Sequence, residues 1–203
     1  MTWRTGPAPG GDTVVAVTCP PVPPMTAFTP ADLPTAALLD DGSVDTDALM
    51  ARLVREWSAA GVRVRGLTME WDRGEDSCAS PMELVDVHTA DRYLVSQSLG
   101  REAQGCRADP QGFARAGDVL RRALSEAPDL VVCNRFGGLE AEGEGLRAEL
   151  LDLMSAGVPL LTIVSGRYRA AWDEFTGGAP VLPATAEAAR AWWAAVHAQA
   201  TAR

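Results

Sequence analysis

Lysine is absent from this sequence, and all 18 basic residues among its 203 positions are arginine. A working phosphate-binding P-loop places a lysine on the terminal phosphates of its nucleotide. Schiff-base chemistry likewise requires a lysine amine. The composition therefore excludes a standard P-loop enzyme and a Schiff-base enzyme.

Cysteine and histidine are also scarce. The four cysteines, Cys19, Cys78, Cys106 and Cys133, form no C-x-x-C pair, which excludes zinc-ribbon and thioredoxin-like sites. The sequence contains only two histidines, so a metal site built from several histidine ligands is excluded as well. We expect Cys133 to belong to the core, because it ends a short apolar run.

A positive net charge and long hydrophobic runs are lacking too. The formal net charge of −9 argues against nucleic acid as a partner, because an acidic surface repels phosphate backbones. No apolar run approaches the ~20 residues of a membrane span, and the N-terminus shows no signal-peptide pattern. The sequence thus predicts a cytoplasmic protein with no membrane partner, and it leaves a homo-oligomer open.

Apolar segments of strand and helix type alternate along most of the chain. Residues 1–30 are rich in proline and glycine and are expected to form a disordered or loosely attached tail. Residues 31–203 are expected to form a single domain. The order of segments predicts an α/β fold with a mainly parallel sheet, helices on both faces and an inserted β-hairpin. The expected strands cover 35–39, 62–69, 130–133, 158–164 and 181–182, the hairpin 82–87 and 92–97, and the helices 45–59, 110–125, 146–156, 166–178 and 185–200.

The segment 129–145, DLVVCNRFGGLEAEGEG, is central to this organisation. Its apolar part predicts a strand buried on both faces, and Asn134 and Arg135 follow where that strand is expected to end. In open α/β sheets, ligands bind at the carboxyl ends of the strands. Asn134 and Arg135 are therefore candidate ligand-binding residues.

The loop 96–109 offers a second group of polar residues. Hydroxyl, amide and guanidinium groups, together with N–H groups exposed by glycine, suit a small tetrahedral oxyanion. The opposite interpretation is a surface loop whose arginines pair with nearby acids, while Arg135 pairs with Glu140 or Glu142. The candidate set is Ser96, Gln97, Ser98, Gly100, Arg101, Gly105, Cys106 and Arg107, joined by Asn134 and Arg135.

Several segments together resemble a known bacterial family. They are AAGVRVRGL, SQSLG with a following CRAD, DLVVCNRFGGLEAEGEGL, GVPLLTIV and WDEFTGG, spread over about residues 35–178. The chain resembles a family of domains of unknown function, some of whose members carry names linking them to molybdenum transport or to nucleoside-triphosphatases. This resemblance implies a fold similar to that of P-loop nucleoside-triphosphatases.

The position of the phosphate loop departs from that fold's usual chemistry. Between the first strand and the first helix, the chain reads DDGSVDTD at 40–47, with four aspartates and no G-K-[ST]. These carboxylates would repel a triphosphate unless a metal ion bridged them. The resemblance therefore implies a P-loop-like scaffold with a degenerate phosphate loop.

Three functions agree with these residues. The leading hypothesis is a small-oxyanion-binding protein, with molybdate or tungstate favoured through the names in the family. The alternative is a nucleotide-binding protein or slow nucleoside-triphosphatase, in which Arg135 or Arg107 serves the phosphates and Glu140 or Asp40 holds Mg²⁺. The third is a scaffold that binds another protein through its acidic surface. No catalytic residue and no resident metal site are assigned.

Overall fold

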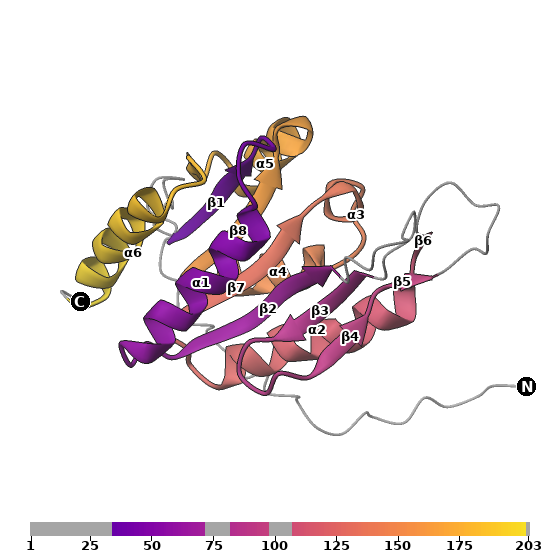
Figure 1. Cartoon of the computed structure of the whole chain (residues 1–203), viewed down its shortest axis with the longest axis horizontal. Helices are drawn as coiled ribbons and strands as arrows, with labels where there is room; N and C mark the ends of the chain where they lie inside the picture. The colour runs from indigo at the N-terminus through magenta and orange to yellow at the C-terminus, as the bar shows by residue number, and fades with distance from the viewer. Residues whose placement is uncertain (1–33, 72–81, 98–106, 202–203) are drawn as a thin grey trace, which may run out of the picture.

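The computed structural model describes residues 34–71, 82–97 and 107–201. Within them, seven strands form one sheet in the order β4–β3–β2–β7–β8–β1–β9 (Figure 1). The strands are β1 Thr35–Asp40, β2 Val64–Trp71, β3 Met82–Asp86, β4 Arg92–Leu94, β7 Leu130–Phe136, β8 Leu160–Ser165 and β9 Val181–Leu182. The expected tail of residues 1–30 lies outside the described residues.

The sheet is mainly parallel. Strand β8 pairs in parallel with β1 and β7, β9 pairs in parallel with β1, and β2 pairs in parallel with β7. Only the β3–β4 hairpin, which extends the sheet beyond β2, makes antiparallel pairs within it. The predicted mainly parallel sheet with an inserted hairpin is confirmed.

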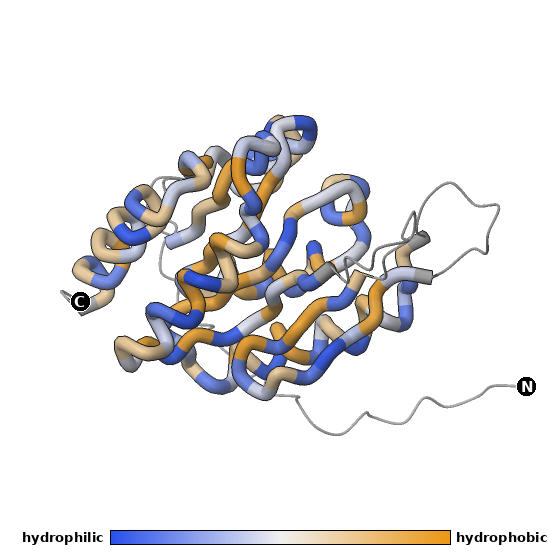
Figure 2. The backbone as a smooth tube through the Cα atoms, in the orientation of Figure 1, coloured by the Kyte–Doolittle hydropathy of each residue, from blue (hydrophilic) through white to orange (hydrophobic). Residues whose placement is uncertain are grey.

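Helices cover both faces of the sheet. Helices α1 (Thr46–Ala59) and α6 (Ala186–Thr201) pack on one face, against side chains such as Leu38, Leu130 and Ile163. The other face carries α2 (Pro110–Ser125), α4 (Arg147–Ser155) and α5 (Arg169–Thr176), which is preceded by the 3₁₀ turn η2 (Gly166–Tyr168). Figure 2 shows hydrophobic stretches running along the strands between these layers. Strands β1, β7 and β8 alternate their apolar side chains between two separate halves of the core.

Strand β7 is buried almost throughout, as its apolar sequence predicts. It is longer than expected, because Asn134 and Arg135 lie inside the strand and the strand ends at Phe136. The register between β7 and β8 shifts between Cys133 and Phe136. The two polar residues therefore lie at an irregularity within the strand and are not part of a loop after it.

The second arm of the predicted hairpin is interrupted. Its main part, β4, ends at Leu94, and Ser96–Gln97 instead forms β5, which pairs with β6 (Arg107–Ala108). At the interruption, the N–H of Val95 still donates to Met82, while the carbonyl of Val95 accepts the N–H of Asp109 at 2.9 Å. The chain thus leaves the main sheet at Val95 to start the separate β5–β6 pair.

Among the described residues, none of the helices has the length and apolarity needed to cross a membrane.

One close approach between strands depends on glycine. Gly66 of β2 lies opposite Val132 of β7 and has a φ of +114°. A Cβ at position 66 would lie 1.9 Å from the carbonyl oxygen of Val132. We therefore expect Gly66→Ala to lower the free energy of unfolding by well over about 1 kcal/mol, because backbone strain and a steric clash act together.

Urea denaturation of the purified variant measures this loss. The matched control is Gly61→Ala, since Gly61 also has a positive φ, +87°, but a Cβ there meets no atom within 4 Å. Equal losses for both variants would show that the close approach to Val132 contributes nothing beyond backbone strain.

Candidate functional site

The connection from β1 to α1 is built from aspartate side chains. An oxygen of Asp40 accepts the N–H of Gly42 at 3.3 Å, and one of Asp41 accepts that of Ser43 at 2.9 Å. Asp45 caps α1 by accepting the N–H of Ala48 at 2.9 Å. Aspartate favours such local bonds to its own backbone, which is why this segment forms turns and then starts a helix.

Arg135 joins this connection to the middle of the sheet. Its Nη1 lies 2.8 Å from Asp40 Oδ2, and its Nη2 lies 2.9 Å and 3.1 Å from the two carboxylate oxygens of Asp47. The three side chains are only 26%, 22% and 14% exposed for Arg135, Asp40 and Asp47 respectively. Because the pairing is partly buried and charge-assisted, removing one partner would leave a poorly solvated charge behind.

Asn134 reaches the same cluster from the neighbouring position on β7. Its Nδ2 donates to Asp47 Oδ1 at 2.6 Å, and the residue is only 1% exposed. Its Oδ1, however, is buried and has no hydrogen-bond partner among the described residues, and the same holds for Arg135 Nε. A buried polar group without a partner costs about 1–3 kcal/mol, so such groups call for a functional explanation.

A cavity of about 400 Å³ opens beside this cluster. Its charged lining consists of Asp40, Asp45 and Asp47 with Arg135, which gives a formal charge of −2. A bare oxyanion placed there would be repelled, since two unit charges 4 Å apart interact by about 4 kcal/mol near a protein surface. The electrostatics of this cavity favour a ligand that brings positive charge with it.

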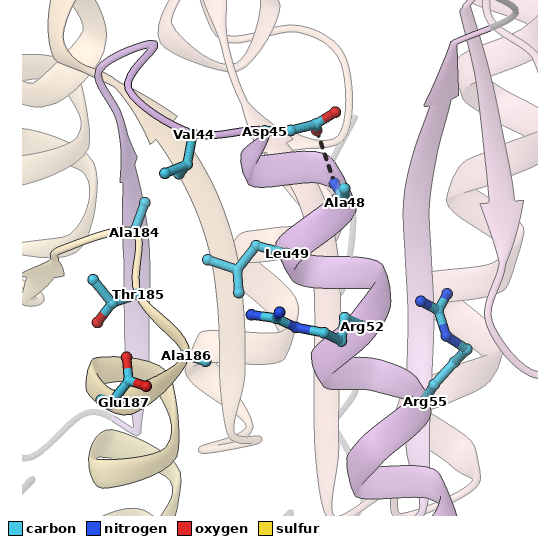
Figure 3. Close-up of a pocket in the computed structure, with 10 residues that line it drawn as sticks. All are labelled: Val44, Asp45, Ala48, Leu49, Arg52, Arg55, Ala184, Thr185, Ala186 and Glu187. Carbon is cyan, nitrogen blue, oxygen red and sulfur yellow. Dashed lines mark hydrogen bonds between the residues drawn. The ribbon is translucent and has the colours of Figure 1, made fainter.

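A second cavity, of about 520 Å³, lies between α1 and the start of α6 (Figure 3). Arg52 extends from α1 toward α6, whereas Arg55 points to the other side of the helix. Val44, which is 46% exposed, borders this cavity and also the one beside Arg135. The β1–α1 connection therefore separates an acidic cavity from a more mixed one.

Glu140 has a structural role in the loop after β7. It lies in the short helix α3 (Gly138–Ala141), and its two carboxylate oxygens accept the N–H groups of Gly137 at 2.9 Å and Leu146 at 3.0 Å. Burial raises the pKa of its carboxyl group above the ordinary value, although these bonds act in the opposite direction. With both oxygens engaged, Glu140 is poorly placed to hold Mg²⁺ or to orient a water molecule. The interpretation of the loop as a purely structural surface feature expected Arg135 to pair with Glu140 or Glu142. Arg135 pairs instead with Asp40 and Asp47.

The residues predicted from the loop 96–109 are only partly described. Ser98, Gly100, Arg101, Gly105 and Cys106 lie outside the described residues. Gln97 and Arg107 are partners in the β5–β6 register. The hydroxyl oxygen of Ser96 accepts the N–H of Met82 at 2.8 Å, and Ser96 is buried. In the sheet order, β3 and β2 separate β4, which precedes this loop, from β7, which carries Asn134 and Arg135. An oxyanion site shared by the two segments stays a prediction.

The described residues contain no group of three or more histidine, cysteine, aspartate and glutamate side chains that could hold a metal ion. The nearest approach to such a site is the pair Asp40 and Asp47, which both bind the guanidinium of Arg135. Mg²⁺ commonly uses one or two carboxylates and completes its shell with waters and substrate phosphates. The cluster fits that mode of binding and does not fit a closed metal cage.

Sequence reasoning noted the four aspartates but did not pair them with Arg135. A usable signal was present: Asp40 ends a buried strand and Asp47 lies in the first turn of the next helix. Both positions fall at the carboxyl edge of a parallel sheet, as does Arg135. Opposite charges at one edge of a sheet are candidates for pairing, whatever their separation in sequence.

Comparisons with known proteins agree with this architecture. A family model described as "Protein of unknown function (DUF2478)" matches residues 35–192. A protein of Bradyrhizobium diazoefficiens, named "Molybdenum import ATP-binding protein ModC 2", is 34% identical over 159 residues, which are 78% of this chain and 18% of that protein. The chain thus spans about a fifth of the length of this relative.

A solved structure supports the fold. The solution structure of a human cancer-related nucleoside triphosphatase superposes with a TM-score of 0.53, covering 83% of this chain and 97% of that one, at 19% identity. At this identity, the likeness shows the fold alone. The P-loop-like α/β fold implied by the sequence resemblance is confirmed.

The buried carboxyl of Glu140 gives a test by pH. The pKa of this carboxyl is raised in the folded state from 4.5, so above pH 4.5 this group binds more protons in the folded protein than in the unfolded chain. Stability contributed by this group is therefore present below pH 4.5 and is lost as pH rises through the folded pKa. We expect the stability of the wild type relative to Glu140→Gln to fall as pH rises from about 4.5.

Urea denaturation of both proteins at several pH values measures the difference. Carboxylates whose pKa is lowered, such as Asp129 beside Arg63, titrate alike in both proteins and cancel. A difference that stays constant or grows with pH would contradict the burial of an ionisable Glu140.

Proposed function

Because the chain belongs to the DUF2478 family and its fold is P-loop-like, we propose that it binds a nucleoside triphosphate as the magnesium complex, at the carboxyl edge of β1 and β7. The observation that carries the proposal is the ion pairing of Arg135 with Asp40 and Asp47 beside the 400 Å³ cavity. The cluster combines a phosphate-binding cation with carboxylates that suit Mg²⁺. The names of the relative and of the solved structure, an ATP-binding protein and a nucleoside triphosphatase, support the same class of ligand.

Arg135 takes the part that a lysine plays in standard P-loop proteins. Its guanidinium carries a permanent charge and binds phosphate oxygens through two parallel N–H donors. A P-loop lysine would lie on the β1–α1 connection. Arg135 instead comes from β7, which lies on the other side of β8 from β1. In the proposed complex, Mg²⁺ is bound by Asp40 and Asp47, and Arg135 contacts the phosphates.

The proposal is for binding and not for rapid hydrolysis. Glu140, the acidic residue that follows β7, is buried and accepts two main-chain N–H groups. A carboxylate held in this way has little freedom to orient an attacking water. Turnover, if measured, is therefore expected to be slow.

Nucleotide binding is testable by isothermal titration with ATP and GTP in the presence of Mg²⁺. We expect saturable binding to the wild type. Loss of one charge-assisted contact costs roughly 1.5–3 kcal/mol, so Arg135→Gln should weaken binding by about tenfold to a hundredfold.

The matched control is Arg63→Gln. Arg63 also pairs with an aspartate, Asp129 at 2.9 Å, but it precedes β2 and so lies at the opposite edge of the sheet. Its removal should leave nucleotide affinity unchanged. Absence of binding by any nucleotide with Mg²⁺ at millimolar concentration would rule out the proposed function.

A second candidate is the binding of molybdate or tungstate by the loop 96–109 together with Asn134 and Arg135. It is favoured by the name of the relative from Bradyrhizobium, which refers to molybdenum import. It ranks second because the cavity beside Arg135 has a formal charge of −2, and a tetrahedral dianion brings no cation to offset it.

Titration with molybdate, tungstate, sulfate and phosphate, without divalent cations, distinguishes the two candidates. If the second is right, molybdate or tungstate binds the wild type, and Arg107→Ala weakens that binding by about tenfold or more, as expected for one lost charged contact. No heat with any of the four anions would remove this candidate and leave the first intact.

A further inference from the structure

Asn134 and Arg135 are consecutive residues of β7, yet both of their side chains bond to Asp47. In a regular strand, successive side chains point to opposite faces of the sheet. These two side chains converge where the register between β7 and β8 shifts, between Cys133 and Phe136. The irregularity in β7 thus coincides with a shared partner on α1.

The amide of Asn134 contacts the carboxylate and not the cavity. Its Nδ2 donates to Asp47 Oδ1 at 2.6 Å, and the same oxygen accepts Nη2 of Arg135 at 2.9 Å. The nitrogen faces Asp47 because an amide oxygen there would oppose a carboxylate. Asp47 and Arg135 both line the 400 Å³ cavity, whereas Asn134 is not among its lining residues. Any influence of Asn134 on a ligand in this cavity therefore passes through these two side chains.

Burial decreases outward along this series of contacts. Asn134 is almost completely buried, Asp47 is less so, and Arg135 is the most exposed of the three. Close packing restricts a buried side chain to few rotamers, while a long ionic side chain near the surface keeps more freedom. Asn134 is thus the most firmly held of the three groups, and the carboxylate is oriented against it.

An uncharged donor suits this position. A basic side chain at position 134 would compete with Arg135 for Asp47, and an acidic one would repel the carboxylate. An amide nitrogen adds one hydrogen bond and leaves the negative charge of Asp47 to the guanidinium. Asp47 makes a further interaction as well, so Asn134 helps to orient this carboxylate and is not its only support.

We propose that Asn134 is a positioning residue, whose buried amide orients the carboxylate of Asp47 and thereby fixes the guanidinium of Arg135 beside the cavity. The effect on Arg135 is independent of any ligand. A second effect, on nucleotide affinity, rests on the proposed function, in which Asp47 binds Mg²⁺ and Arg135 contacts the phosphates.

Reaction of the full chain with phenylglyoxal, an arginine reagent, tests the first effect without nucleotide. Peptide mapping by mass spectrometry gives the rate at which Arg135 is modified. We expect Asn134→Ala to raise this rate severalfold, because a loosened Asp47 holds the guanidinium less well. Arg63, which pairs with Asp129 at the opposite edge of the sheet, is the internal control and should react at the same rate in both proteins.

A double-mutant cycle tests whether Asn134 acts through Asp47. Asp47→Ala should also raise the rate for Arg135, and adding Asn134→Ala to it should change the rate no further. Asn134→Ala that only damages the packing of the core would raise the rate again in the double variant, and that result would overturn the inference.

Circular dichroism checks that Asn134→Ala is folded. If it is not, hydrogen exchange of the Asn134 side-chain amide is compared between the wild type and Asp47→Ala. Exchange that is slow in the wild type and faster in Asp47→Ala supports the inference, and equal exchange in the two proteins overturns it.

Isothermal titration with ATP and Mg²⁺ measures the second effect. We expect Asn134→Ala to weaken nucleotide binding by about tenfold, as for the loss of one hydrogen bond to a charged group. In the Asp47→Ala background, the same change should weaken it no further.

The results separate this inference from the proposed function. Equal modification rates for Arg135 in the wild type and in folded Asn134→Ala overturn the inference, whether or not nucleotide binds. A faster rate that disappears as an added effect in the double variant supports it, even if the wild type binds no nucleotide and the proposed function fails. Nucleotide that binds the wild type and Asn134→Ala equally well overturns the second effect and leaves the proposed function standing.

Discussion

The bridge from Arg135 to Asp40 and Asp47 is the interaction on which the carboxyl edge of this sheet depends. It connects β7 with β1 and α1 across the end of β8, so it ties together elements that are not neighbours in the sheet. Without the guanidinium, the carboxylates of Asp40 and Asp47 would lose the cation that they share in a partly buried position. The β1–α1 connection has four aspartates in eight residues, and two of them pair with this one guanidinium. The edge is thus organised by ionic pairing, where a standard P-loop protein uses glycine, lysine and the bound phosphate.

An arginine on β7 and a lysine on a P-loop differ in their chemistry. A P-loop lysine is a point charge on the same loop as the backbone N–H groups that hold the phosphates. Arg135 lies on another strand, carries a planar fork of donors, and is already paired with carboxylates. A ligand must therefore compete with Asp40 and Asp47 for this cation, whereas it would find a lysine free. Under the proposed function, this competition favours ligands that bring a cation of their own.

Much of the fold follows from local sequence patterns. Apolar runs of strand length and amphipathic helix patterns, with Asp45 and Asp109 as helix caps, locate most elements within a few residues. The sequence predicts an end of β7 at Cys133, before its actual end at Phe136. Asn134 and Arg135 are polar, and polar residues usually mark the end of a buried strand. Burial of Asn134 depends on its bond to Asp47, 87 positions away, and no local pattern contains that information. The same limit explains why the aspartates of the β1–α1 connection were seen as a repulsive group and not as partners of Arg135.

The way Glu140 holds its loop has a consequence for how this surface can change. Its carboxylate binds only main-chain N–H groups, those of Gly137 and Leu146, so the path of the loop does not depend on most of the side chains between them. Gly145 is an exception, because a Cβ there would lie 2.2 Å from Glu140 Oε1. Residues such as Glu142 and Glu144 are exposed and free of that constraint. The loop beside the site is therefore a tolerant scaffold, whose outward side chains can be varied to alter recognition while the backbone that supports Arg135 stays in place.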